Sequence, residues 1–124
     1  MSEIELKVYY EDTDCLGMVY HANYLKYFER ARTEMVNDLG RPIHEWNQAG
    51  FNFVVYKVDV TFHKPARLAD RLRVVTRKTE GSAFRLKLDQ RVFRGTELLT
   101  EAMVHLVCLD AKLQLRELPA ELRA

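Results

Sequence analysis

The fold is decided by residues 23–40, NYLKYFERARTEMVNDLG. Apolar side chains recur every three or four residues along this stretch and charged side chains occupy the opposite side, which is the pattern of an amphipathic helix. The apolar face consists of Tyr24, Tyr27, Phe28, Ala31, Met35 and Leu39. Asn23 is the predicted N-cap, and Gly40 followed by Pro42 gives a stop signal. We therefore expect one helix of about four turns, with one face packed against other elements.

On both sides of this helix the sequence alternates with the period of β-strands. One strand is expected before it, at 4–10, and a short stretch after it, at 42–49, can be helical. Further strands are expected at 53–62, 71–79, 84–93 and 102–109, with a short edge strand at 113–118 and turns at Gly81 and Gly95. One face of the 53–62 strand is expected to carry Val54, Tyr56, Val58, Val60 and Phe62. The nearly all-apolar 102–109 stretch suits a central strand covered on both faces, with His105 in the core.

This order of elements predicts one α+β domain, residues 1–124, in which a largely antiparallel sheet packs against one helix face. A single helix cannot cover every apolar strand residue, and Tyr56, Val58, Phe84 and Phe93 are left for other contacts. We therefore expect the chain to associate with other subunits.

The composition is that of a soluble globular chain, with 48% hydrophobic and 30% charged residues among 124. Nineteen Lys and Arg nearly balance eighteen Asp and Glu, for a net charge of +1, so no global field would recruit nucleic acid or anionic lipid. The opening stretch MSEIELKVYY lacks the features of a secretory signal, and no long apolar run indicates a transmembrane segment. We therefore expect a cytoplasmic protein, with Cys15 and Cys108 reduced and Cys108 in the core.

The densest polar cluster is YYEDTDCLGMVYHANY, residues 9–24, between the first strand and the helix. A helix N-terminus presents unpaired backbone N–H groups and partial positive charge, which favour a nearby carboxylate and stabilise a developing oxyanion. Asp14, Gly17 and His21 all lie close to this point in the sequence. This cluster is therefore the candidate site.

The longer stretch YYEDTDCLGMVYHANYLKYFERARTEM, residues 9–35, resembles the signature of the hotdog acyl-CoA thioesterases, above all the bacterial family encoded with the Tol-Pal envelope system. The similarity continues through VVYKVDVTFHKPARLAD, residues 54–70, and extends more distantly to the 4-hydroxybenzoyl-CoA thioesterases. It implies the hotdog fold, in which a sheet wraps one long helix, and a thioester tunnel between the subunits of a homodimer or homotetramer. It also implies that Asp14 is the catalytic carboxylate and His21 a second active-site residue, with no cofactor.

On this resemblance Asp14 acts as base or nucleophile, backbone N–H groups at the helix start polarise the thioester carbonyl, and His21 orients water or the acyl group. Other interpretations stay open. Asp12 and Asp14 are also residues that commonly end strands and cap turns. Cys15 with His21 is a conceivable Cys–His nucleophile, although the family motif assigns the chemistry to the carboxylate.

The phosphates of acyl-CoA require basic residues at the tunnel mouth. The candidate substrate contacts are Gly17, Tyr20, His63, Lys64, Arg67, Arg77 and Lys78. The 4-hydroxybenzoyl-CoA branch has consecutive basic residues where this chain has Glu80, Gly81 and Ser82, which leaves the individual phosphate contacts open. No metal site is expected, because the remaining histidines, such as His44, share no ligand spacing.

Two rival functions remain. A hotdog hydratase or dehydratase also pairs a carboxylate with a histidine but adds or removes water across a carbon–carbon bond. A non-catalytic scaffold would instead act with envelope or lipid-synthesis proteins. The full E-D-T-D to H-A-N-Y motif before the helix favours hydrolysis.

Overall fold

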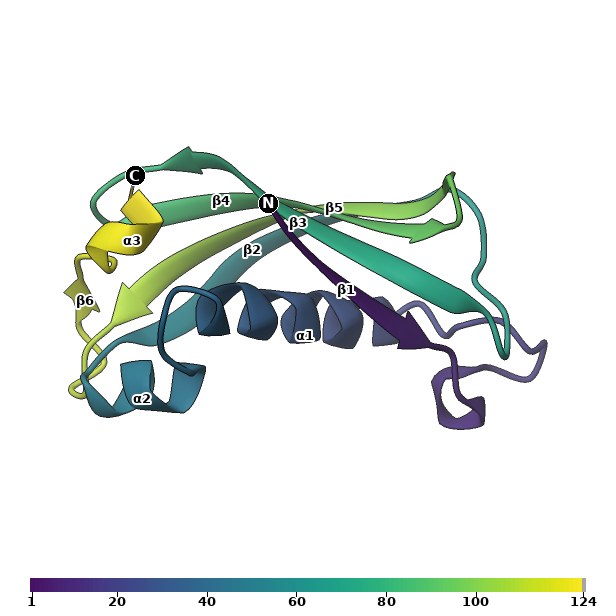
Figure 1. Cartoon of the computed structure of the whole chain (residues 1–124), viewed down its shortest axis with the longest axis horizontal. Helices are drawn as coiled ribbons and strands as arrows, with labels where there is room; N and C mark the ends of the chain where they lie inside the picture. Colours follow the sequence, from purple (N-terminus) through teal and green to yellow (C-terminus); the bar gives the residue numbers. More distant parts are fainter. Residues whose placement is uncertain (124) are drawn as a thin grey trace.

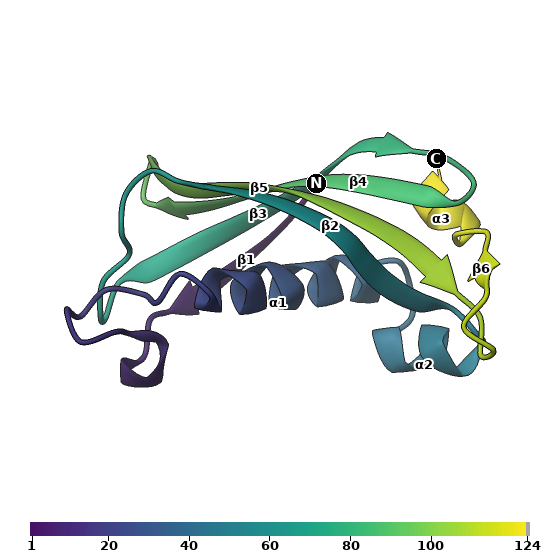
Figure 2. The ribbon, with the colours of Figure 1, turned by 180° about the vertical axis from the view of Figure 1, so that it is seen from behind.

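The computed structural model describes residues 1–123, in which one antiparallel sheet curves over a single long helix (Figure 1). The helix, α1 (Asn23–Asn37), lies along the concave side of the sheet in both views (Figures 1 and 2). The strands are β1 (Ser2–Lys7), β2 (Asn52–Phe62), β3 (Arg71–Gly81), β4 (Arg85–Arg94), β5 (Glu97–Leu109) and β6 (Leu115–Arg116). The short elements are η1 (Tyr10–Asp12), α2 (Ile43–Gln48) and α3 (Ala120–Arg123). The predicted α+β fold, with an antiparallel sheet around one helix, is confirmed.

The strands follow the order β1-β3-β4-β5-β2, and β6 pairs with the end of β5. Within residues 1–123, β1 and β2 each pair with one strand, so each has a free edge. The loop from β1 to α1 lies at one end of the molecule, and α2, β6 and α3 lie at the other (Figure 1). None of the helices in residues 1–123 has the length and hydropathy that crossing a bilayer requires.

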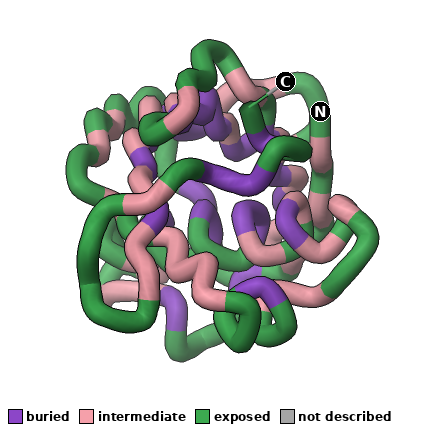
Figure 3. The backbone as a smooth tube through the Cα atoms, turned by 90° about the vertical axis from the view of Figure 1, so that its left-hand side faces the viewer, coloured by how far each residue is buried: buried purple, intermediate pink, exposed green. Residues whose placement is uncertain are grey.

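The core forms where α1 meets the sheet, and the buried segments gather there in the end-on view (Figure 3). Burial of apolar surface is the main stabilising contribution to such a contact. The buried residues of α1 include Tyr24, Tyr27, Phe28, Ala31 and Val36, and those of the sheet include Leu72, Val74, Leu86, Leu88, Val92 and Val104. Met35 and Leu39 are partly buried against this cluster. The predicted apolar face of the helix is therefore confirmed.

A buried polar network also ties α1 to the sheet. The guanidinium of Arg32 donates to Gln90 Oε1 at 3.0 Å and pairs with Glu29. The side-chain amide of Gln90 donates to the Phe28 carbonyl at 3.1 Å and to Thr76 Oγ1 at 2.8 Å. Because unpaired polar groups are costly in a core, this network fixes how α1 lies on the sheet.

The start of α1 differs from the prediction. Ala22 is the N-cap residue and makes no side-chain capping bond, whereas Asn23 is the first helical residue. The side chain of Asn23 instead donates to the carbonyl of Asp12. The predicted capping role of Asn23 is wrong, because Asn23 lies one residue inside the helix and its side chain instead bonds to a residue eleven positions away. Gly40 has φ +109°, which suits its predicted place after the end of the helix.

Strand β2 departs from simple alternation. Its pairing with β5 shifts register between Val55 and Lys57, which is a β-bulge. Phe53 and Val55 before the bulge, and Val58 and Val60 after it, pack against the core, whereas the side chains of Val54, Tyr56 and Phe62 are exposed. The predicted single face from Val54 to Phe62 is therefore wrong.

Other element boundaries also shift. Tyr10 belongs to η1 rather than to β1, and the predicted strand at 113–118 shrinks to the two residues of β6. β5 is buried on one face and half-buried on the other. His105 lies on the half-buried face and its ring packs 5.7 Å from that of Tyr56, so its predicted core position is wrong. Cys108 is buried as predicted, and burial raises the pKa of its thiol.

Candidate active site

Asp14 lies in a tight turn between η1 and α1. Thr13 forms a β-bridge with Val19, and inside it the Asp14 N–H donates to the Met18 carbonyl at 2.8 Å. The chain reverses at Gly17, whose N–H donates to the Asp14 carbonyl at 3.2 Å and whose φ is +76°, a conformation that favours glycine. These bonds hold the Asp14 backbone in one place.

The carboxylate of Asp14 is only partly used by this turn. Its Oδ1 accepts the N–H of Leu16 at 2.8 Å and that of Met18 at 3.2 Å. Its Oδ2 has no hydrogen-bond or ion-pair partner anywhere in residues 1–123. Asp14 thus caps the turn with one oxygen, and its other oxygen has no partner among the described residues. The capping and functional interpretations are compatible.

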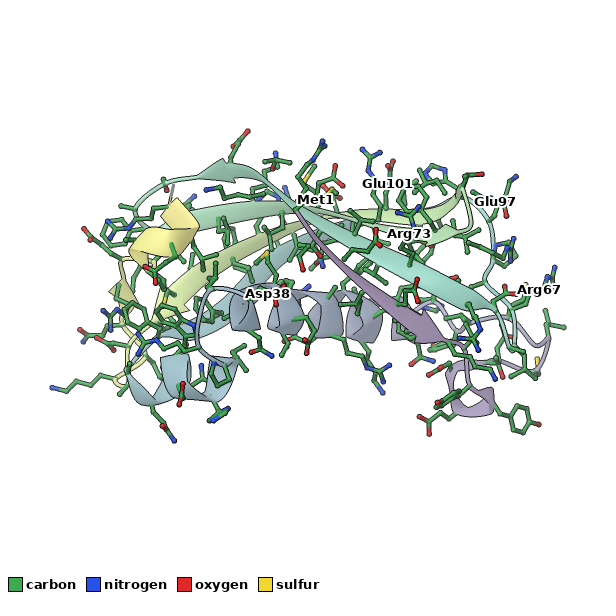
Figure 4. The ribbon with its side chains drawn as sticks, in the orientation of Figure 1. Met1, Asp38, Arg67, Arg73, Glu97 and Glu101 are labelled. Carbon is green, nitrogen blue, oxygen red and sulfur yellow. The ribbon has the colours of Figure 1, made fainter. Side chains whose placement is uncertain are left out.

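The segment after β2 supports the turn from the other side. The Val19 N–H donates to the Ala66 carbonyl at 2.9 Å, and Met18 forms a β-bridge with Arg67. The Leu68 N–H donates to the Gly17 carbonyl at 3.0 Å. Arg67 therefore lies beside the turn, at the end of the molecule that carries the loop before α1 (Figure 4). Its guanidinium has no partner among the described residues.

Asp12 joins the turn to the first turn of α1. Its carbonyl accepts the Tyr20 N–H at 2.9 Å and the Asn23 side-chain amide at 2.8 Å, and its buried carboxylate accepts the Tyr9 N–H at 2.9 Å. Burial, and then this carboxylate, raise the pKa of Tyr27, which stays a neutral phenol. The Tyr27 hydroxyl makes no hydrogen bond of acceptable geometry, to Asp12 or elsewhere in residues 1–123.

Backbone N–H groups remain free where α1 begins. No acceptor within residues 1–123 takes the N–H of His21 or that of Ala22. The His21 side chain is exposed, with its ring 4.4 Å from that of Tyr20 and 6.4 Å from that of Phe62. No hydrogen bond joins His21 to Asp14 in the described chain. The two residues lie on opposite arms of the same turn.

The predicted basic residues are scattered. Lys64 pairs with Glu97 at 2.8 Å, and His63 Nε2 lies 3.4 Å from Glu101. Arg77 pairs with Asp89 at 3.5 Å, and Lys78 donates to the Leu122 carbonyl at 3.3 Å. Arg77 and Lys78 lie about 20 Å along β3 from its site end, at about 3.3 Å per residue. Of the predicted contacts, the fold places three at the turn that carries Asp14, namely Gly17, Tyr20 and Arg67.

The structure also adds residues that the pattern did not single out for the site. The ring of Phe62 lies 5.5 Å from that of Tyr24, and the Tyr24 hydroxyl accepts the Ala66 N–H at 3.1 Å. No sequence signal linked Phe62 to the loop, because the two are forty residues apart and meet only through the sheet. No group of three or more His, Cys, Asp or Glu side chains in residues 1–123 could hold a metal ion.

The chain has close similarity to known proteins. The model of the thioesterase-like superfamily matches residues 8–124. The chain is 40% identical to the acyl-CoA thioester hydrolase YbgC of Escherichia coli O6:H1, over 96% of this chain and 90% of that protein. A probable thioesterase from Bartonella henselae superposes with a TM-score of 0.88 at 30% identity, over 94% and 98% of the two chains. A 1,4-dihydroxy-2-naphthoyl-CoA thioesterase from Synechocystis superposes at 0.87 and 26% identity, over 97% and 90%.

Proposed function

This chain belongs to the thioesterase-like superfamily, and from that premise we propose that it hydrolyses acyl-CoA to free acid and CoA at the turn that carries Asp14. The activity is supported by 40% identity to an acyl-CoA thioester hydrolase over nearly the whole chain. The observation that supports the site is the free Oδ2 of Asp14, whose carboxylate is held in the turn before α1 by bonds from Leu16 and Met18 to Oδ1.

The Asp14 carboxylate can start hydrolysis in two ways. As a base, it takes a proton from water while the water oxygen attacks the thioester carbonyl, and the tetrahedral intermediate expels CoA thiolate, which takes up the proton. As a nucleophile, it attacks the carbonyl itself and expels the thiolate, and water then cleaves the resulting anhydride. Both routes need one unengaged carboxylate oxygen.

The start of α1 supplies the complementary donors. Negative charge develops on the carbonyl oxygen as the intermediate forms, and preorganised N–H groups stabilise it. The N–H groups of His21 and Ala22 are unpaired in residues 1–123 and lie at the N-cap of α1 and one residue before it, next to the electropositive first turn. The exposed imidazole of His21 orients the water or the acyl group.

Among the basic residues, Arg67 is best placed to bind a CoA phosphate. It lies beside the turn and its guanidinium is free among the described residues, whereas Lys64 and Arg77 are engaged with carboxylates. Gly17 leaves open space beside the turn, because a Cβ built there meets nothing within 4 Å. The CoA moiety would lie over this side of the turn, against Gly17 and the Arg67 side chain.

The proposal includes a homodimer or homotetramer in the cytoplasm, acting on its own or with envelope or lipid-synthesis proteins. The free edge of β2 and its exposed side chains, Val54, Tyr56 and Phe62, support pairing of subunits there. Phe62 also contacts the His21 ring. Pairing at this edge would cover the site with a second subunit.

The decisive experiment supplies saturated acyl-CoAs of short and long chains, and benzoyl-CoA, and measures release of free thiol. A hydrolase cleaves these substrates, whereas a hydratase has no double bond to act on. The matched assay for hydration uses crotonyl-CoA, an unsaturated substrate. Hydration would lower its enoyl absorbance without releasing free thiol. Hydration without thiol release from any acyl-CoA would contradict the proposed function.

A further inference from the structure

The side chain of Asn23 bridges two parts of the site that are eleven residues apart in sequence. It belongs to the first residue of α1, and its Nδ2 donates to the Asp12 carbonyl at 2.8 Å. The same carbonyl accepts the Tyr20 N–H at 2.9 Å. The bond is not a helix cap, because in it the side chain donates to a carbonyl outside the helix, whereas a cap accepts an N–H of the helix's first turn.

The carbonyl that Asn23 contacts is itself firmly held. Asp12 is 9% exposed, its N–H donates to the Tyr9 carbonyl at 3.0 Å, and its carboxylate accepts the Tyr9 N–H at 2.9 Å. From there to Asp14 the chain is locked by the Thr13–Val19 bridge and by the bond from the Asp14 N–H to Met18. Any shift of Asp12 relative to α1 is therefore carried to the Asp14 carboxylate.

We propose that Asn23 is a positioning residue, whose side-chain amide sets the place of the Asp14 carboxylate relative to the free N–H groups at the start of α1. This inference rests on the proposed function. Besides the bonds within the turn, the Asp12 carbonyl accepts one backbone donor, the Tyr20 N–H, which comes from the segment before α1. The amide of Asn23 adds a second donor from the helix itself, and two donors on one carbonyl fix its orientation.

The first test replaces Asn23 by Ala and measures thiol release. A misplacement of about 1 Å between reacting groups costs roughly a hundredfold in rate, so we expect kcat to fall about ten- to a hundredfold while KM changes less than about threefold. The matched control is Asn47→Ala, because Asn47 makes the same kind of bond, to the Phe51 carbonyl at 2.9 Å, in α2. It should change the melting temperature by a similar amount and leave kcat unchanged.

The second test uses Asn23→Asp, which keeps the shape of the side chain. The introduced carboxyl donates to the Asp12 carbonyl when protonated and repels it when ionised. The nearest charged and titratable groups are Asp12, to which the amide bonds, His21 two residues before it, and Lys26 and Tyr27 three and four residues on along α1. We expect kcat of Asn23→Asp relative to the wild type to rise as pH falls, whereas the same ratio for Asn23→Ala stays flat.

Asp14→Asn, alone and combined with Asn23→Ala, separates this inference from the proposed function. If Asn23 acts through Asp14, the double variant should be no slower than Asp14→Asn. A fully active Asp14→Asn would overturn the role of Asp14 itself. An inactive Asp14→Asn beside an Asn23→Ala with wild-type kcat would overturn only the positioning role, as would parallel pH ratios for Asn23→Asp and Asn23→Ala.

Discussion

Aromatic side chains lie near both ends of helix α1, and the two groups differ in how far they are buried. At the far end, Trp46 is 3% exposed, with the Arg41 guanidinium 3.9 Å from its ring centroid and the Phe51 ring 5.5 Å away. At the site end, Tyr20 is 49% exposed and Phe62 is 50% exposed. The chain covers its own rings at one end and leaves them open at the other.

The same contrast holds for the polar groups beside the helix. After α1, the Asn37 side chain accepts the Ile43 N–H at 2.8 Å, and the Arg116 guanidinium stacks 3.7 Å from the Phe51 ring centroid and donates to the Gly50 carbonyl. Before α1, one oxygen of Asp14 has no partner among the described residues. Changes at the far end should therefore affect stability, and changes at the site end should affect rate.

The largest effect is expected from Asp14→Asn, which keeps the size of the side chain and removes its negative charge. Loss of a catalytic base or nucleophile lowers kcat by about 10²- to 10⁴-fold, with a much smaller effect on KM. Because Asn also caps turns well, the melting temperature should hardly change. Thiol release and a thermal melt check both expectations. A folded variant with near-normal kcat would contradict the role of Asp14 as catalytic base or nucleophile.

At the opposite end, Trp46→Ala should lower the free energy of unfolding by about 3 kcal/mol, the low end for removing a buried aromatic side chain. Urea denaturation measures this loss. Turnover per folded enzyme should stay within about twofold of the wild type, because Trp46 lies at the end of α1 remote from Asp14. If the folded Trp46→Ala enzyme lost most of its kcat, the two ends of α1 would not differ in function as described.

The substitution His21→Ala measures how much the imidazole side chain contributes to kcat. The backbone N–H of this residue survives the change, so the donor at the start of α1 remains. We expect kcat to fall about tenfold, less than for Asp14→Asn, because only an orienting contact is lost and about 1.4 kcal/mol corresponds to that factor. Comparing kcat and KM of the two variants checks this order. A loss as large as that of Asp14→Asn would give the imidazole a direct part in proton transfer.

Cys15→Ala should have the smallest effect. Cys15 is exposed and directly follows Asp14, yet the proposed chemistry does not use its thiol. We expect kcat within about twofold of the wild type, measured by release of free thiol with the same acyl-CoA. Inactivity of a folded Cys15→Ala protein would restore the Cys–His interpretation.

The sequence by itself determined the local features of this protein. The period of the apolar residues in 23–37 gave the helix and its buried face, and the alternation in β4 gave its core side, since Leu86, Leu88 and Val92 are all buried. Both signals are local, because a helix or strand repeats its geometry every few residues. The motif around Asp14 and His21 likewise identified the candidate site and the family.

Only the tertiary structure decided the features that depend on distant partners. The bulge at Val55 and Lys57 changes which β2 residues face the core, and it exists only through pairing with β5. Asn23 bonds to Asp12 instead of capping α1, and Arg67 reaches the turn whereas Arg77 does not. Strand register and loop packing are set by contacts between segments far apart in the chain, so no local pattern encodes them.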